Sequence, residues 1–258
     1  MKSSKALWAI GVLTPLAALA AWWFGSANST NPFFPPLQQI LIRFQELWLF
    51  AHFSSDVMLS LRNLTLGFTL GVAAGLVIGF VLAMVPLIRW MFEPVIHFFR
   101  GIPAVALVPI LITLIGFGVE MRVANIALAA FFPTLIATMD GIRSVDGGLK
   151  DVCQVYRLTT AERITRVYLP SASPQIASGM QVSLQVAFIV MIASEMLGSS
   201  QGIGALTLLA QQSFMSADMW AGILLLGLIG FMANMVFELV KRRVLAWYIG
   251  LRAQERAA

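Results

Sequence analysis

The sequence is poor in charged residues. Of its 258 residues, only 11% are Asp, Glu, Lys or Arg and 59% are hydrophobic, whereas soluble domains carry about 25% charged residues. Such a chain has too little polar surface to cover a water-soluble globule of this size. The composition therefore predicts a membrane protein.

Cysteine, histidine and phosphate-binding motifs are also scarce. The single cysteine, Cys153, excludes an internal disulfide and a cysteine-ligated metal cluster. We interpret the two histidines, His52 and His97, as interface or packing residues. No Gly-x-x-x-x-Gly-Lys-Ser/Thr loop occurs, and none of the four lysines follows a glycine. We therefore expect no cofactor or metal in this chain, and any ATP hydrolysis would require another polypeptide.

Apolar runs long enough to cross a bilayer separate the charged segments. A helix needs about twenty apolar residues to cross a hydrocarbon core of about 30 Å. Six runs meet this length and predict an all-α polytopic membrane protein, near residues 6–24, 60–84, 98–115, 122–139, 174–196 and 218–240. The first run could instead be a signal peptide, but its length and the poor cleavage site "GSANS" favour an uncleaved span.

The basic residues fall between these runs and form no single patch, which argues against nucleic-acid binding. With the N-terminus inside, fourteen basic residues lie on the inner side and three on the outer side. The inner residues are Lys2, Lys5, Arg89, Arg100, Arg143, Lys150, Arg157, Arg163, Arg166, Lys241, Arg242, Arg243, Arg252 and Arg256; the outer ones are Arg43, Arg62 and Arg122. This excess predicts cytoplasmic N- and C-termini.

Two segments outside the runs predict further helices on the outer side. Hydrophobic residues recur at helical spacing over residues 37–48 and predict an amphipathic surface helix. The Gly-rich residues 198–214 predict an outer loop with a partial re-entrant helix. We expect one membrane domain over residues 1–258. It comprises a first span plus outer helix (1–56) and a core (57–245), and the core includes a cytoplasmic loop (141–173).

The second run carries glycines at intervals of four residues, at Gly67, Gly71, Gly75 and Gly79. This spacing places them on one helix face and predicts close packing against another helix.

In the third run, Pro103 and Pro109 interrupt the helix pattern. The interruption indicates either a border of a solute pathway or a simple kink.

Several polar residues in the runs are candidates for a solute pathway. Ser178, Gln181 and Gln185 form a stripe on the fifth run, which indicates either contacts between helices or a pathway lining. Glu195 lies near the outer end of that run, either in interfacial water or facing the bundle. Arg100 either assists an anion or extends to the inner membrane surface.

Residues 141–170 carry eight of the 29 charged side chains. Thr159 and Glu162 form a capping box for a helix running to about Tyr168, and Pro170 is expected to end it. A short amphipathic helix precedes it, with Leu149, Val152, Cys153 and Tyr156 at helical spacing. A mere connection needs only a few residues, so this loop predicts a docking surface for a cytoplasmic partner.

The loop resembles the cytoplasmic signature of binding-protein-dependent ABC transporter permeases: Glu-Ala-Ala, three residues, Gly, nine residues, Ile-x-Leu-Pro. Asp151, Val152 and Cys153 take the first three positions, Arg157 takes the glycine position, and Val167, Leu169 and Pro170 take the end. Fragments "PAVALVP" (103–109), "FFPTLIATMDGIRSVD" (131–146) and "SEMLGSSQGIG" (194–204) resemble the nitrate/sulfonate/taurine/bicarbonate branch.

This resemblance implies an ABC importer permease fold in a bacterial inner membrane. Two permease copies would form the pathway for a small anionic solute delivered by an external binding protein. Two ATPase subunits, which carry ATP and Mg²⁺, would dock on the loop. The implied coupling residues are Asp151, Val152, Cys153, Arg157, Thr159, Glu162, Val167, Leu169 and Pro170.

Arg157 departs from the signature, because a left-handed glycine turn would cost an arginine about 1–2 kcal/mol. We expect the turn to move to Leu158–Thr159 while Arg157 stays helical; the alternative is that the strain is retained.

An ion-coupled secondary carrier is the alternative function, but it would normally show inverted repeats and acidic residues near mid-membrane. A serine hydrolase is disfavoured, because Ser194 lacks a nucleophile motif.

Overall fold

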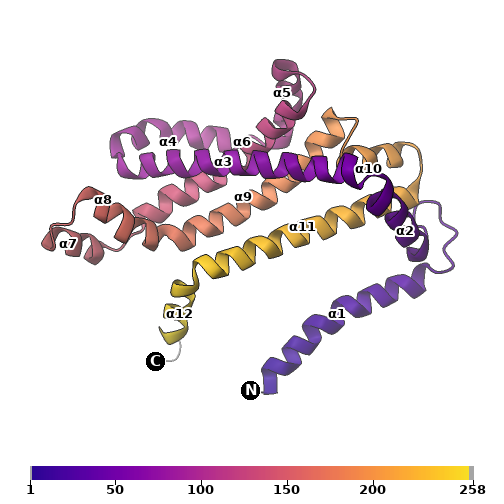
Figure 1. Ribbon diagram of the computed structural model, residues 1–258, viewed down its shortest axis with the longest axis horizontal. Coiled ribbons are helices and arrows are strands. Elements are labelled where there is room, and N and C mark those ends of the chain that lie inside the picture. The colour runs from indigo at the N-terminus through magenta and orange to yellow at the C-terminus, as the bar shows by residue number, and fades with distance from the viewer. Residues whose placement is uncertain (1, 256–258) are drawn as a thin grey trace.

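The computed structural model describes the backbone of residues 2–255 and the side chains of residues 10–11 and 13–250. That part of the chain is helical and contains no strand (Figure 1). The helices in chain order are α1 (Lys2–Ser26), α2 (Leu37–Phe44), α3 (Met58–Met84), α4 (Pro86–Arg100), α5 (Val108–Ile115), α6 (Val119–Arg143), α7 (Gly147–Val155), α8 (Thr160–Glu162), α9 (Leu169–Gly198), α10 (Ile203–Gln212), α11 (Ser216–Val244) and α12 (Ala246–Glu255). Short π-helical segments are η1 (Gln45–Ala51), η2 (Phe53–Val57) and η4 (Arg163–Tyr168), and η3 (Ala104–Leu107) is a 3-10 turn.

Four continuous helices of the described residues are long and apolar enough to cross a membrane. They are Phe53–Met84, Val119–Arg143, Thr160–Gly198 and Ser216–Val244. These helices contain the predicted second, fourth, fifth and sixth spans. The predicted first span lies in α1, and the side chains of residues 2–9 and 12 of this helix fall outside the described part.

The third predicted span, 98–115, is wrong as a single helix. α4 ends at Arg100, and the helical pair Pro86–Arg100 and Ala104–Ile115 is bent by 85°. Pro103 has no amide and disfavours helical geometry at the preceding residue, so the chain cannot continue straight from α4. Pro109 lies in the first turn of α5, where a missing amide is tolerated. If the bent pair is taken as one span, it would be a fifth crossing.

The glycine face of α3 packs directly on α6. A methyl group added at Gly67 would lie 2.6 Å from the side chain of Ile126, and one added at Gly79 would lie 2.6 Å from the carbonyl oxygen of Leu135. At Gly71 the added methyl would overlap the carbonyl oxygen of Ala127. The contacts advance along both helices in the same direction, so α3 and α6 run parallel. Only glycine leaves room for this separation.

α9 packs on α6 in the opposite direction. A methyl group added at Gly179 would overlap the Cβ of Ala137. Nearby, the hydroxyls of Thr134 and Ser183 lie 2.7 Å apart, and Ser183 also donates to the carbonyl oxygen of Ala130 at 2.8 Å. Small and hydroxyl-bearing side chains therefore join α3, α6 and α9 into one closely packed block, which we call the three-helix block.

The predicted outer helix is present as α2 and η1. Its buried residues Leu37, Ile40 and Trp48 pack with Ile203 of α10 and with α11. The guanidinium of Arg43 on its polar side makes a bidentate ion pair with Asp218 at the start of α11. The partial helix predicted within 198–214 is α10.

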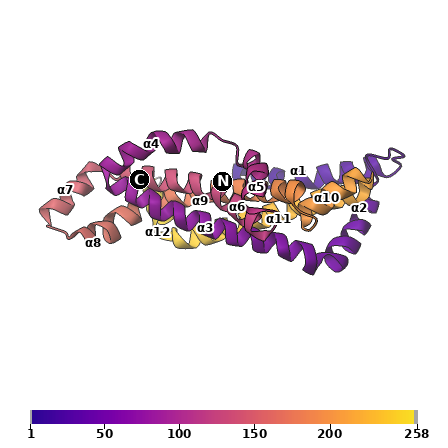
Figure 2. The same cartoon turned by 90° about the horizontal axis from the view of Figure 1, so that it is seen from above.

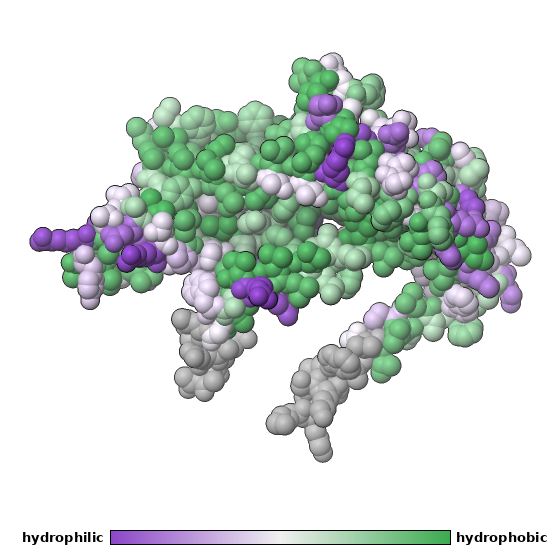
Figure 3. Space-filling view, viewed as in Figure 1, coloured by the Kyte–Doolittle hydropathy of each residue, from purple (hydrophilic) through white to green (hydrophobic). Residues whose placement is uncertain are grey.

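The polar loop that contains α7 and α8 and the polar segments around α2 and α10 lie at opposite ends of the molecule. In Figures 1 and 2, α7 and α8 lie at one end of the long axis, whereas α2 and α10 lie at the other. Figure 3 shows hydrophilic residues gathered at both ends, with mostly hydrophobic residues between them. Exposed apolar side chains such as Val77 on α3 and Phe231 on α11 suit contact with lipid in this middle region.

The contact between α3 and α6 predicts a sharp difference between two glycine substitutions. Gly71→Ala places a methyl group against the α6 backbone, so we expect a loss of about 1–3 kcal/mol in the free energy of unfolding. Gly227→Ala on α11 meets nothing within 4 Å and serves as the control. Thermal unfolding of the purified chain in detergent measures both. Equal midpoints would contradict the close contact.

Candidate functional site

The loop 141–173 forms a helical hairpin, Gly147–Tyr168, made of α7, α8 and η4. Asp146 caps the start of α7, and its carboxylate accepts from the amide of Gly148 at 2.7 Å. Cys153 is the buried residue of α7. The first predicted helix of the loop is therefore present as α7.

Arg157 carries the turn between the two helices, so the predicted shift to Leu158–Thr159 is wrong. Its φ is +50°, in the left-handed region. The amide of Arg157 donates to the carbonyl of Gln154, and the amide of Leu158 donates to that of Cys153, both at 3.0 Å. These two bonds form a Schellman motif, which satisfies carbonyls at the end of α7. The strain is retained because moving the turn would break both bonds.

The capping box at Thr159 is confirmed. The Thr159 hydroxyl accepts from the amide of Glu162, and the Glu162 carboxylate accepts from the amide of Thr159 at 3.0 Å. The prediction that Pro170 ends this helix is wrong, because α8, η4 and α9 form one helix of 39 residues, Thr160–Gly198. Hydrogen bonding changes from π to α at Leu169, so Pro170 lies in the first turn of α9, where its missing amide is tolerated.

The tip of the hairpin presents apolar side chains to its surroundings. Val155 is 78% exposed, Tyr156 74% and Val152 48%. Asp151, Arg157 and Thr159 are also exposed, and Glu162 and Val167 are partly buried. Leu169 is 39% exposed at the start of α9. This mixture of exposed aromatic, aliphatic and charged groups is suited to a protein partner.

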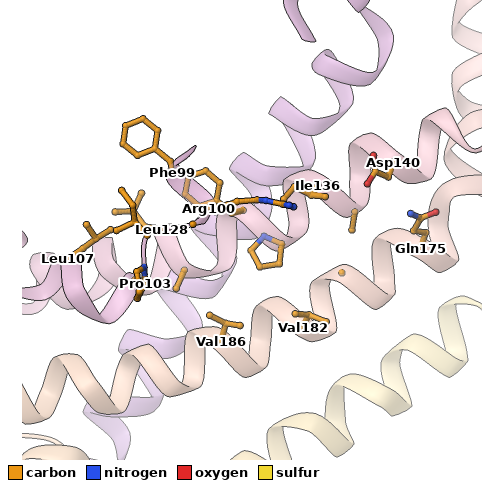
Figure 4. Close-up of a pocket in the computed structure, with 18 residues that line it drawn as sticks. Phe99, Arg100, Pro103, Leu107, Leu128, Ile136, Asp140, Gln175, Val182 and Val186 are labelled. Carbon is orange, nitrogen blue, oxygen red and sulfur yellow. The ribbon is translucent and has the colours of Figure 1, made fainter. Parts of the chain in front are cut away.

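A cavity of about 700 Å³ opens beside the break between α4 and η3 (Figure 4). Its walls are the chain from Phe99 to Ala104, one face of α6 from Leu128 to Asp140, and α9 from Gln175 to Val186. The lining is mostly apolar. It lies on the three-helix block, so its shape follows from the packing of α6 on α9.

Two charged residues line this cavity, Arg100 and Asp140. Asp140 has a cation nearby, because Arg143 lies 3.7 Å from its carboxylate. Arg100 makes no ion pair among the described residues, and in Figure 4 its side chain extends toward Ile136 of α6. The cavity therefore has one positive group whose charge is not matched by an ion pair.

The other polar residues considered for a pathway lie elsewhere. Gln181 bonds to Asn234 and to Lys241 of α11, at 2.9 and 2.6 Å. Ser178 donates to the carbonyl of Pro174 on its own helix, and Gln185 is exposed. The cavity wall on α9 is formed by Gln175, Gly179, Val182 and Val186. The structure brings none of these three predicted polar residues to that wall.

Glu195 is fully buried near the C-terminal end of α9 and accepts from the amide of Gly204 at 3.0 Å. The reading that placed it in interfacial water is therefore wrong. Sequence reasoning missed Gly101 as a cavity residue, whereas Pro103, which it assigned to a pathway border or a kink, lines the cavity. The available signal was the proline at the start of "PAVALVP", which marks the helix break. Among the described residues, no group of three His, Cys, Asp or Glu side chains could hold a metal ion.

Comparisons with known proteins agree with this geometry. Residues 71–246 match the family described as binding-protein-dependent transport system inner membrane component. The chain is 31% identical over 242 residues to a Bacillus subtilis protein named as an aliphatic sulfonates transport permease, SsuC, covering 93% of this chain and 88% of the relative. It is 26% identical to the taurine transport system permease protein TauC of Escherichia coli, covering 93% and 89%.

A solved structure has the same fold. It is an inward-facing MetNI methionine ABC transporter, whose matching chain superposes with a TM-score of 0.64 at 16% identity. The match covers 73% of this chain and 94% of that one.

The left-handed turn predicts that Arg157→Gly stabilises the hairpin by about 1 kcal/mol, because glycine adopts this backbone without a Cβ clash. Hydrogen exchange of the amides in residues 150–158 should slow by about fivefold. Gln154→Gly is the matched control, since glycine inside α7 should speed exchange by a similar factor. Faster exchange in Arg157→Gly would contradict the strained turn.

Proposed function

Because the chain belongs to the family of binding-protein-dependent transport system inner membrane components, and is therefore the permease subunit of an ABC importer, we propose that it carries a small anion of the sulfonate class. We further propose that the hairpin Gly147–Tyr168 is the docking surface for the ATPase subunit. The chain is a transport subunit and not an enzyme. An ion-coupled secondary carrier is not favoured.

The chemistry of the cavity supports an anionic solute. Two relatives are named for sulfonate and taurine transport, and both solutes carry a negatively charged sulfonate group. Arg100 places a positive charge on the wall of a mostly apolar cavity. In such surroundings a single charge acts on an ion more strongly than in bulk water. Arg100 would therefore attract the sulfonate while the apolar walls accept the rest of the solute.

The continuity of the helix Thr160–Gly198 is the observation that carries the coupling role. At 39 residues it is about 58 Å long, nearly twice the thickness of the hydrocarbon core. Its first turns belong to the hairpin, and its middle forms a wall of the cavity. A force applied to the hairpin by an ATPase would therefore reach the cavity without crossing a flexible joint.

We propose the following arrangement for the complete transporter. Two copies of the chain would face one another across the cavity, and two ATPase subunits with ATP and Mg²⁺ would bind the two hairpins. The contacting residues would be Asp151, Val152, Arg157, Thr159, Glu162, Val167, Leu169 and Pro170. The structure corrects the expected contact of Cys153, because this side chain is buried and would support the contact surface from within α7. An external binding protein would approach the end formed by α2 and α10, with both termini of the chain in the cytoplasm of a bacterial cell.

Docking at the hairpin predicts that Tyr156→Asp weakens binding of the ATPase. Tyr156 is 74% exposed, so the substitution alters the surface more than the core. An aspartate in an apolar contact should reduce the ATPase recovered with the purified permease by at least about tenfold. Gln38→Asp, an equal change of charge at the opposite end of the molecule, is the control. Equal recovery in both variants would contradict docking at the hairpin.

Attraction of the solute by Arg100 predicts that Arg100→Gln slows taurine import by at least about fivefold in liposomes that contain the complete transporter. Arg100→Lys keeps the charge and should retain most of the import. The control is Arg89→Gln, because Arg89 lies 3.9 Å from Glu93 and outside the cavity wall. Unchanged import in Arg100→Gln would contradict this role, and absence of taurine import in the parent would contradict the sulfonate class.

A further inference from the structure

The beginning of α10 is held by three side chains from two other helical segments. The amide of Gly202 donates to the carboxylate of Asp56 at 2.8 Å, and the amide of Ile203 donates to the hydroxyl of Ser60 at 3.1 Å. The next amide, that of Gly204, donates to Glu195 at 3.0 Å. We call Asp56, Ser60 and Glu195 the α10 socket. It satisfies three consecutive amides that have no partner within α10.

The socket is closed to its surroundings. Asp56 is 4% exposed, and Ser60 and Glu195 are fully buried. Two carboxylates at the positive end of a helix are favourably placed. If α10 left the socket, these carboxylates would remain buried without the amides, which is strongly unfavourable inside a membrane protein. The α10 helix is therefore bound firmly at this end.

Two glycines make the socket geometrically possible. Gly202 has a φ of +109°, and a methyl group there would lie 2.6 Å from the carboxyl carbon of Glu195. A methyl group at Gly204 would lie 2.7 Å from the carbonyl oxygen of Ile192. The fragment "SEMLGSSQGIG" thus contains an acceptor and the two glycines that let the chain approach it.

The connection between α9 and α10 is also tied to α6. Arg122 of α6 is 6% exposed and donates to the hydroxyl of Ser199 and to the carbonyl of Gln201. The socket residues lie on α9 and on the helical segment that ends in α3. All three helices of the block therefore contribute to holding the beginning of α10.

From these contacts we infer that Glu195 is a positioning residue that makes α10 move with α9 during transport. Glu195 lies on the same unbroken helix as the hairpin, and about 35 residues separate it from Thr160, or about 53 Å along the axis. Movement at the hairpin would pass along α9 to Glu195 and then to α10 at the outer end. The origin of this movement rests on the proposed docking of the ATPase, whereas the link between α9 and α10 does not.

Hydrogen exchange of the complete transporter tests whether the link depends on Glu195. Glu195→Leu should speed exchange of the Gly204 amide by about tenfold or more, because this amide loses its carboxyl acceptor. Glu195→Gln keeps a carbonyl acceptor and should restore most of the protection. The control is Ser194→Ala, since the buried Ser194 hydroxyl donates only within α9, to the carbonyl of Met191. Unchanged exchange in Glu195→Leu would overturn the inference.

Distances between spin labels test whether the link acts in transport. Labels are placed at Leu197 on α9 and Gln211 on α10, and the buried Cys153 is left in place. In the parent and in Glu195→Gln, the distance should stay the same without nucleotide and with ATP trapped by vanadate. In Glu195→Leu it should shift between the two states. A shift in the parent, or an unchanged distance in Glu195→Leu, would overturn the inference.

The two proposals fail separately. If Tyr156→Asp releases the ATPase but Glu195→Leu alters neither exchange nor label distance, the docking stands and the role of Glu195 is rejected. If Tyr156→Asp retains the ATPase but Glu195→Leu frees α10, the docking is rejected and the link between α9 and α10 stands.

Discussion

The close approach of α3, α6 and α9 is the constraint on which the other features depend. Lipid is as apolar as the side chains it replaces, so helices in a membrane gain little from hiding apolar surface and depend on packing. Gly67, Gly79 and Gly179 allow that packing because backbone meets backbone or Cβ at these positions. The cavity wall, the hairpin and the α10 socket are all connected to helices that these contacts hold in place.

α9 combines three tasks that separate elements could have shared. Its first turns continue the helix that begins at the capping box of Thr159, its middle forms a wall of the cavity, and its C-terminal end supplies Glu195. The bonds of Gln181 to Asn234 and Lys241 also join α9 to α11. A helix with packing partners along its length is suited to transmit displacement with little bending, since packed interiors deform poorly.

The sequence predicted the parts of the fold that depend on composition and short-range spacing. The spans in α3, α6, α9 and α11, the glycine face and the capping box at Thr159 follow from local patterns. The turn at Arg157 did not, because a strain of about 1–2 kcal/mol is offset by two hydrogen bonds that only the folded hairpin reveals. The role of Glu195 was also hidden, since its partners depend on how α3 and α10 pack. The proline at position 103 indicated a break in the helix, but the sequence did not show the direction in which the chain bends there.

The unbroken helix from Thr160 to Gly198 has a consequence for how this protein can change in evolution. Each residue in a helix turns the chain by about 100°. One inserted or deleted residue between the hairpin and Glu195 would rotate the two ends relative to each other, so that one of them faces the wrong neighbour. Related proteins can therefore vary the side chains of this segment more easily than its length, because its two ends contact different neighbours.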